Sequence, residues 1–157
     1  MPERPNVFDP VWEAEVPGPF AFRAARIGHA TGSRQLGATL YEIDPGGAVS
    51  PLHVHWANEE LIIALTTGTT LRTPDAERIL EPGELVACPP GPDGAHQLRN
   101  RGDAPARVLV VSTMHLPEVA EHLDSGKVVT ITRTDESSVE AFRRTDAVAP
   151  MLDEPGG

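Results

Sequence analysis

Two histidines and two glutamates lie within eight consecutive residues, HVHWANEE, at positions 53–60. Alternate side chains of a strand point to the same face, so His53 and His55 can converge on one point. Imidazole nitrogen is a common ligand of divalent transition metals, and Glu59 or Glu60, at the start of the next strand, would add an oxygen ligand. Polar groups that lead into an apolar strand cost free energy unless they are paired. The residue types therefore suggest a divalent cation as their partner.

A third imidazole, His96, follows a turn rich in proline and glycine and opens another strand-like segment, HQLRN. Three imidazoles and one carboxylate would hold a divalent ion and leave one or more positions open for water or substrate. A closed tetrahedral arrangement would instead make the site structural. The histidine pair alone also fits a simpler interpretation, two surface histidines on a half-exposed strand.

The spacing around these residues follows two longer patterns. The segment GAVSPLHVHWANEE fits G-x5-H-x-H-x4-E, and GELVACPPGPDGAHQLRN fits G-x5-P-x-G followed by a histidine and an asparagine. In this order, the two patterns resemble the two motifs of the cupin superfamily, and the resemblance spans residues 36–115. Shorter runs, among them NVFDPVWE, HWANEEL and GPDGAHQ, resemble a group of small single-domain bacterial cupins.

The resemblance implies that one divalent metal ion, iron, manganese, nickel or zinc, is bound by His53, His55, Glu60 and His96. Glu60 is preferred to Glu59 because the superfamily usually places four residues between the second histidine and the ligand glutamate. Glu59 would then face solvent or contact the site from behind the ligands. The sequence departs from the pattern at Thr67, where a glycine is expected, and by two extra residues before His96. We expect Gly94 to give this longer loop its backbone freedom.

Short apolar segments between Gly/Pro turns predict the strands that position these residues. The predicted strands are residues 20–27, 36–43, 60–65, 69–72, 85–88, 96–100 and 107–114. Strands at such short spacing, with no helical periods between them, favour an antiparallel sandwich or barrel. With the resemblance, this predicts an all-β cupin double-stranded β-helix, a jelly-roll-like barrel of two antiparallel sheets.

The length of 157 residues predicts a single cupin domain with three parts. Residues 1–35 would form an N-terminal arm and the first strands, residues 36–115 the barrel, and residues 116–157 a C-terminal extension. Five prolines in residues 1–19 indicate an arm that lies over the barrel or over a partner subunit. Residues 135–144 predict a helix, with Asp135 as N-cap and two arginines near its C-terminus. Residues 149–157 predict a frayed or disordered tail.

The charge balance restricts the classes of partner. Thirteen basic and 23 acidic residues give a net charge of -10, which argues against a nucleic-acid or anionic-membrane surface and favours a small-molecule ligand. Cys88 is the single cysteine, so no intramolecular disulfide is possible and a reducing compartment is expected. No apolar run resembles a signal peptide or spans a bilayer. These features predict a cytoplasmic protein.

Further residues near the motifs have two interpretations each. Tyr41 is a candidate catalytic group that would donate a proton into the cavity, or a tyrosine of the barrel wall. Trp56 would line the cavity mouth for substrate binding, or serve packing. Gln97 is a second candidate for substrate binding, and Cys88 is expected to be a small buried apolar residue. The remaining histidines, His29, His115 and His122, are interpreted as ordinary surface or loop residues.

The residues favour a metal-dependent enzyme that acts on a small molecule in the barrel. With iron, the site would bind dioxygen beside the substrate, as in dioxygenase-like cupins; with zinc, manganese or nickel, it would polarise a carbonyl for isomerase or lyase chemistry. Glu59, Tyr41 and the ligand glutamate are the candidate proton-transfer groups. The alternatives are a non-catalytic small-molecule-binding or regulatory cupin and a purely structural metal site. A homodimer is expected, because edge strands and the arm need to be covered.

Overall fold

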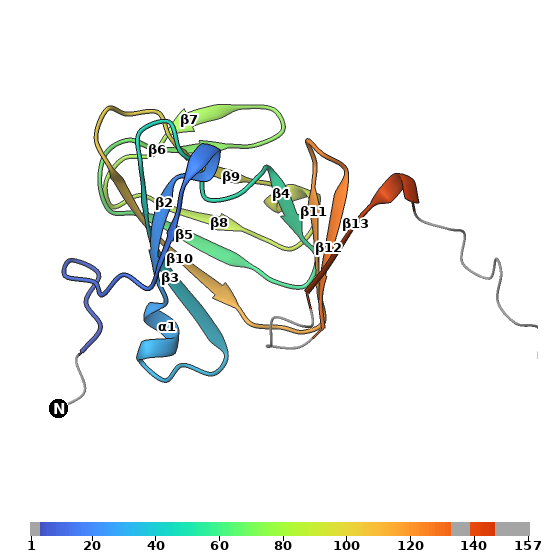
Figure 1. The fold of residues 1–157 in the computed structure, drawn as a ribbon, viewed down its shortest axis with the longest axis horizontal. Helices are drawn as coiled ribbons and strands as arrows, with labels where there is room; N and C mark the ends of the chain where they lie inside the picture. The colour runs from blue at the N-terminus through green and yellow to red at the C-terminus, as the bar shows by residue number, and fades with distance from the viewer. Residues whose placement is uncertain (1–3, 133–138, 147–157) are drawn as a thin grey trace, which may run out of the picture.

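The computed structural model describes residues 4–132 and 139–146, which form a mostly β structure with antiparallel strand pairing (Figure 1). The strands are β1 (Ala14–Val16), β2 (Phe22–Ala25), β3 (Leu36–Ile43), β4 (His53–His55), β5 (Glu60–Ala64), β6 (Thr69–Arg72), β7 (Glu77–Ile79), β8 (Leu85–Cys88), β9 (Gln97–Asn100), β10 (Ala106–Thr113), β11 (Glu118–His122), β12 (Lys127–Ile131) and β13 (Val139–Arg143). The helical elements are η1 (Gly18–Phe20), α1 (Ile27–Ala30), η2 (Pro92–Gly94) and η4 (Arg144–Asp146). In these described residues, no helix is long and apolar enough to cross a membrane.

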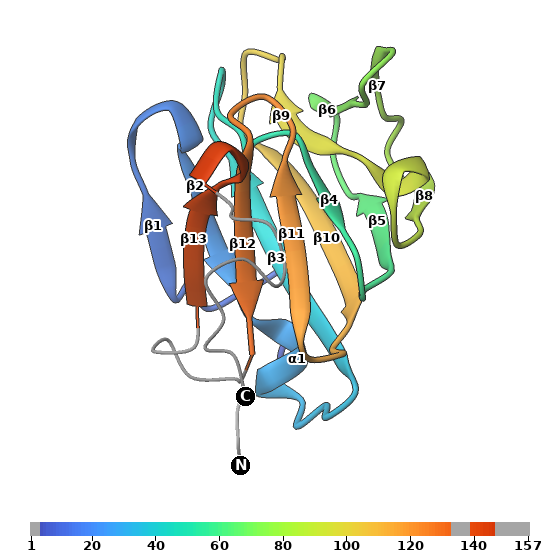
Figure 2. The same cartoon turned by 90° about the vertical axis from the view of Figure 1, so that its right-hand side faces the viewer.

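The strands form three sheets. The large sheet has the order β1-β2-β3-β10-β5-β8, a four-stranded sheet has the order β13-β12-β11-β4, and a three-stranded sheet has the order β7-β6-β9. Isolated bridges pair Ala48 with Arg99 and His53 with His96, and so connect the two smaller sheets. Figures 1 and 2 show the β11–β13 ribbon on the opposite side of the molecule from the large sheet. The predicted all-β architecture of antiparallel strands is confirmed.

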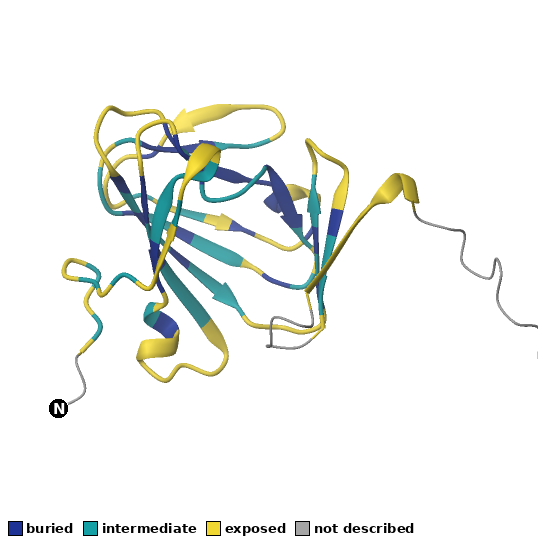
Figure 3. Cartoon of the chain, viewed as in Figure 1, coloured by how far each residue is buried: buried dark blue, intermediate teal, exposed yellow. Residues whose placement is uncertain are grey.

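The core lies between the sheets and is built mainly from one face of β3, β5, β6, β8, β9 and β10. Its fully buried members include Ile43, Ile62, Leu80 and Val108, and Figure 3 shows buried residues on β4, β6 and β9, whereas β7 and β13 are exposed. Cys88 belongs to this cluster with 6% of its surface exposed, as the sequence predicted. β-branched and leucine side chains dominate because they pack well on a pleated surface.

Part of the N-terminal arm lies on the chain's own barrel. β1 pairs with β2, and the Trp12 ring stacks on the guanidinium groups of Arg23 and Arg107 at 4.7 and 5.6 Å from their central carbons. Both arginines donate to the buried Glu42 carboxylate. Burial opposes ionisation of this carboxyl, but the two arginines outweigh it and hold the pKa of Glu42 below its usual value.

The predicted strands are present, although several boundaries shift by one or two residues. Strands β1, β7, β11 and β12 were not predicted from the sequence. The predicted helix at residues 135–144 is wrong where the structure describes it, because Val139–Arg143 form a strand that pairs with β12. The hydrogen bonds available along β12 outweigh a weak helical pattern that contains β-branched and aromatic residues. The predicted N-cap Asp135 and the tail at 149–157 lie outside the described residues.

Replacing Glu42 with glutamine is expected to lower the free energy of unfolding at pH 7 by about 1–2 kcal/mol, because charged hydrogen bonds are lost while both arginines remain partly exposed. The folded-state pKa lies below the unfolded-state value of about 4.5. The stabilisation is therefore fully present above that value and is lost as the pH falls through the folded-state pKa. Chemical unfolding of wild type and Glu42→Gln across this range measures it.

The control for this experiment is Glu81→Gln, an exposed change in the turn before strand β8, which should leave stability unchanged. A wild-type advantage over Glu42→Gln that stayed constant to the lowest pH at which both proteins fold would contradict the role of the ionised carboxylate.

Candidate functional site

Three predicted ligands meet where the three sheets face one another. His53 comes from β4, Glu60 from the start of β5 and His96 from the residue before β9. One ligand atom of each lies within 4.8 Å of the others. The backbone bridge between His53 and His96 sets this geometry, because each N–H donates to the other's carbonyl oxygen at 3.0 Å. Residues far apart in the sequence are thereby placed on one side of the cavity.

The fourth predicted ligand, His55, lies at the edge of this group. Its Nε2 atom is 3.0 Å from Nε2 of His53 and 3.7 Å from the Glu60 carboxylate. Its ring centroid is 6.3 Å from that of His96, farther than the 4.6 Å between His53 and His96. His55 therefore contacts two of the other three residues directly.

Hydrogen bonds at the outer ring nitrogens orient two imidazoles. Nδ1–H of His53 donates to the Pro51 carbonyl at 3.0 Å, and the Ser50 hydroxyl lies 3.2 Å from the same nitrogen. Nδ1–H of His96 donates to the Gly94 carbonyl at 2.8 Å. Because a carbonyl can only accept, the Nε2 atoms of His53 and His96 are directed at the cavity. Metal-binding histidines are commonly oriented in this way.

Glycine is required at position 94, but not for the expected reason. Its φ is not positive; the left-handed conformation belongs to Gly91, with φ of 89°. A Cβ atom at Gly94 would instead lie 1.8 Å from the Pro89 carbonyl oxygen. The longer loop contains the short η2 helix, Pro92–Gly94, and the close backbone approach brings the Gly94 carbonyl to His96.

Charges within the site compensate one another without a metal ion. Burial alone would raise the pKa of Glu60, but the hydrogen bond with His96 and the nearby imidazoles hold it below its usual value. Burial also lowers the pKa of His96, yet interactions with the Cys88 and Glu60 side chains outweigh it and raise that pKa to about 10. The 3.0 Å contact between His96 Nε2 and Glu60 Oε2 is therefore an ion pair in the metal-free protein.

The donor set fits a divalent transition metal. Two ligand nitrogens about 2.1 Å from one ion and at a right angle lie about 3.0 Å apart, which is the separation of the His53 and His55 Nε2 atoms. The contact between His96 and Glu60 has the same length. Imidazole nitrogens with a carboxylate oxygen suit zinc, iron, manganese or nickel.

A cavity of about 240 Å³ opens beside these residues. Its lining combines the four candidate ligands with Tyr41 and Ser50 and with the apolar side chains of Val49, Leu98 and Val110. Burial, followed by the negative charge of Glu60, raises the pKa of Tyr41, so its hydroxyl keeps its proton at neutral pH. Tyr41 therefore lines the cavity into which, as a candidate catalytic group, it would donate a proton.

The other sequence candidates lie outside the cavity lining. Glu59 is exposed, and its backbone N–H donates to the Thr113 hydroxyl. Trp56 is 49% exposed and donates through its indole nitrogen to Glu121 at 2.9 Å. Gln97 is buried, and its side-chain amide donates to the Ser50 carbonyl at 2.7 Å.

Two residues near the site were not identified from the sequence. Glu118 of β11 is buried, and its carboxylate accepts from the Trp56 backbone and the Asn58 amide and lies 3.7 Å from Nδ1 of His55. His122 was interpreted as a surface or loop histidine, but it is half-buried and pairs with His53 across β11 and β4. Their distance in sequence from the motifs gives no local signal for either.

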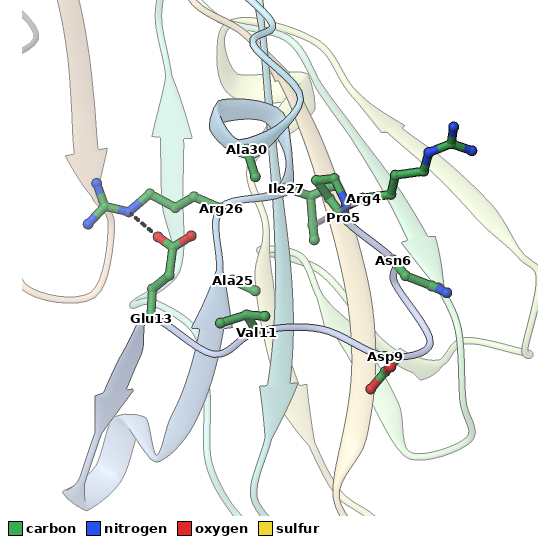
Figure 4. Close-up of a pocket in the computed structure, with 10 residues that line it drawn as sticks. All are labelled: Arg4, Pro5, Asn6, Asp9, Val11, Glu13, Ala25, Arg26, Ile27 and Ala30. Carbon is green, nitrogen blue, oxygen red and sulfur yellow. Dashed lines mark ion pairs between the residues drawn. The ribbon is translucent and has the colours of Figure 1, made fainter. Parts of the chain in front are cut away.

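A second cavity of about 240 Å³ lies between the arm, β2 and α1 (Figure 4). Its lining mixes apolar residues with Arg4, Asp9, Glu13 and Arg26 and shares no residue with the first cavity. Its lining residues include no histidine, and the candidate metal ligands lie instead at the cavity that contains His53.

Comparison with known proteins identifies the family. Residues 39–112 match the family model of the cupin domain. A sugar phosphate isomerase from a cupin superfamily, from Silicibacter pomeroyi, is 28% identical over 90% of each chain, with a TM-score of 0.74. The polyketide cyclase RemF from Streptomyces resistomycificus is 26% identical over 75% of this chain and 84% of its own, with a TM-score of 0.59.

A cupin 2 conserved barrel domain protein from Salinispora arenicola is 27% identical over 59% of this chain and 76% of its own, with a TM-score of 0.50. A comparison with curated proteins finds no match. The resemblance inferred from the two motifs is therefore confirmed at the level of the superfamily.

In the metal-free protein we expect His53 to stay neutral down to about pH 4, because burial, then the neighbouring His96 and His55, lower its pKa. A lowered pKa opposes protonation in the folded state. Its contribution to stability is therefore present above the ordinary value of 6.5 and is lost as the pH falls toward 4. Nitrogen-15 NMR of the imidazoles should show the proton on Nδ1. A charged His53 ring at pH 6 would contradict the burial argument.

Proposed function

We propose that this chain is a metal-dependent cupin enzyme of the isomerase type that acts on a small hydroxy-carbonyl compound. The observation that carries the proposal is the meeting of His53, Glu60 and His96 at a cavity that also holds a protonated tyrosine. The isomerase relative, 28% identical over 90% of both chains, supports this reaction class. A bound divalent ion would act as a Lewis acid toward a carbonyl oxygen.

The size and lining of the cavity favour a small, uncharged polar substrate. Its volume of about 240 Å³ is below the range of about 300–1,000 Å³ typical of drug-sized ligands. No lysine or arginine is among its described lining residues. A phosphate group, if the substrate carries one, would thus lie at the mouth of the cavity rather than within it.

The chain's own residues supply proton transfer and exclusion of water. An isomerisation of a hydroxy-carbonyl compound moves one proton between neighbouring carbons and another between their oxygens. The Tyr41 hydroxyl, which retains its proton, is positioned to donate to a substrate oxygen. The apolar wall formed by Val49, Leu98 and Val110 limits water, which strengthens this hydrogen bond.

Metal content gives the first test. Protein purified without a histidine tag is expected to contain close to one iron, manganese, nickel or zinc ion per chain. His53→Ala and His96→Ala should lose at least about tenfold in affinity, because each removes a direct ligand. His29→Ala, an exposed change on α1, is the matched control. Elemental mass spectrometry measures the content.

Calorimetry in two buffers should also detect the release of about one proton on metal binding at pH 7, because the ion displaces the proton of the His96–Glu60 ion pair. A wild-type protein that is empty and takes up no added metal would refute the metal centre. A fully coordinated ion whose removal lowers only thermal stability would support the structural alternative.

Turnover is tested with aldoses, ketoses and their phosphates in deuterium oxide, where proton NMR detects exchange at the carbon next to the carbonyl. We expect the metal-loaded wild type to exchange this proton, Tyr41→Phe to lose about 10²-fold in kcat while retaining its metal, and His96→Ala to be inactive. His29→Ala should match wild type. Binding of a compound without exchange would favour the non-catalytic alternative, and substrate-dependent oxygen uptake would favour an oxygenase.

A further inference from the structure

A buried carboxylate lies behind the fourth candidate ligand. Glu118 is the first residue of β11, which pairs with β4 (Figure 2), and only 3% of its surface is exposed. Its Oε1 atom lies 3.7 Å from Nδ1 of His55. That nitrogen is also buried, and it has no hydrogen-bond partner among the described residues. A buried polar atom without a partner costs free energy, so its position beside a carboxylate needs an explanation.

Strand register explains how Glu118 reaches His55. Ala120 lies directly opposite His55 across β11 and β4, and Glu118 is two residues from Ala120 on the same face. Diagonal neighbours of this kind lie about 7–8 Å apart, a span that a glutamate side chain can bridge. The small side chain of Ala120 leaves room for this approach.

The hydrogen bonds of Glu118 leave one place for a further donor. Its carboxylate accepts from the backbone N–H groups of Trp56 and Ala57, at 3.0 and 3.4 Å, and from the side chain of Asn58. An ionised carboxylate has about four lone-pair sites, so one remains. Among the described residues, His55 supplies the only basic side-chain nitrogen in ion-pair range of this carboxylate. The three donors anchor the carboxylate and leave His55 as the candidate for the remaining site.

We propose that Glu118 is the positioning residue of His55: it accepts the Nδ1–H of that ring and so directs Nε2 into the metal centre, an inference that rests on the proposed function. The separation of 3.7 Å is longer than a charge-assisted hydrogen bond of about 2.7–2.9 Å, and a movement of about 1 Å closes it. The Nδ1–H groups of His53 and His96 are held in the same way by backbone carbonyls. Carboxylates have this role at many metal-binding histidines.

A neutral imidazole carries one ring hydrogen, and its two possible positions on His55 have opposite consequences. On Nε2, the hydrogen would donate to Nε2 of His53 at 3.0 Å, and the bare Nδ1 atom would face the Glu118 carboxylate. On Nδ1, it is attracted by that carboxylate, and a bond to a charged acceptor is about twice as strong as one to a neutral acceptor. The Nε2 lone pairs of His53 and His55 then face each other, an arrangement that a bound cation would stabilise.

A purely structural role for Glu118 is the alternative. The carboxylate would then serve only to fasten the turn at residues 56–58, which connects β4 to β5. Loss of that function would lower the free energy of unfolding without changing which ring nitrogen of His55 carries the hydrogen. A measurement at the ring nitrogens therefore separates the two roles, and it can be made with and without a metal ion.

Nitrogen-15 NMR of the imidazole rings tests the proposal in the metal-free and the zinc-loaded protein, with His55→Gln to identify the signals. We expect wild type to carry hydrogen on Nδ1 of His55 in both states. In metal-free Glu118→Gln, whose amide can donate as well as accept, Nδ1 should lose it. Competition with a chelating dye should show zinc affinity lowered about 10–100-fold in Glu118→Gln. Glu121→Gln is the matched control on the opposite face of β11, where Glu121 accepts from the Trp56 indole, and it should match wild type.

Wild type without hydrogen on Nδ1 of His55 would overturn the proposal, and this measurement does not depend on a variant that folds. So would a Glu118→Gln protein that is less stable but retains the wild-type His55 signals or the wild-type zinc affinity. In either case, zinc binding by wild type would leave the metal centre itself intact. A wild type that binds no zinc would instead refute the metal centre, and with it the positioning role of Glu118.

Discussion

The pair of backbone hydrogen bonds between His53 and His96 is the constraint on which the site depends. It connects the four-stranded and three-stranded sheets and fixes which residues face the cavity. A register shift of one residue would turn His53 and His55 away from it, because alternate side chains of a strand point to opposite faces. Glu60, at the start of β5 in the large sheet, completes the group only in this register.

This arrangement removes several ionisable groups from water, and electrostatic compensation makes it tolerable. The His96–Glu60 ion pair balances one positive and one negative charge, while burial keeps His53 neutral. The same compensation would suit a cation, since an entering ion would replace the proton on His96 and would meet a carboxylate that is already ionised. Stability without metal, and the proposed affinity for a metal ion, would therefore depend on the same contacts.

Much of this could be predicted from the sequence, because the predicted strands are local and apolar and the two motifs have fixed spacing. The strands β7 and β11 were missed because ERI and EVAEH are short and charged, so their pairing partners decide their conformation. For the same reason Val139–Arg143 adopts a strand instead of the predicted helix. Glu118 and His122 reach the site only through the pairing of β11 with β4, which no local pattern encodes.

The two faces of the large sheet relate the cavity to the rest of the molecule. Tyr41, Glu60 and Val110 point inward to the cavity, and their immediate neighbours in β3, β5 and β10 point outward. Because packed interiors deform little, a displacement of the outer face of the sheet would also displace β3, the strand that carries Tyr41. The arm and α1 cover part of this outer face, where Leu40 and Ala25 are almost completely buried. The position of the Tyr41 hydroxyl relative to Glu60 then depends on contacts made on the far side of the sheet.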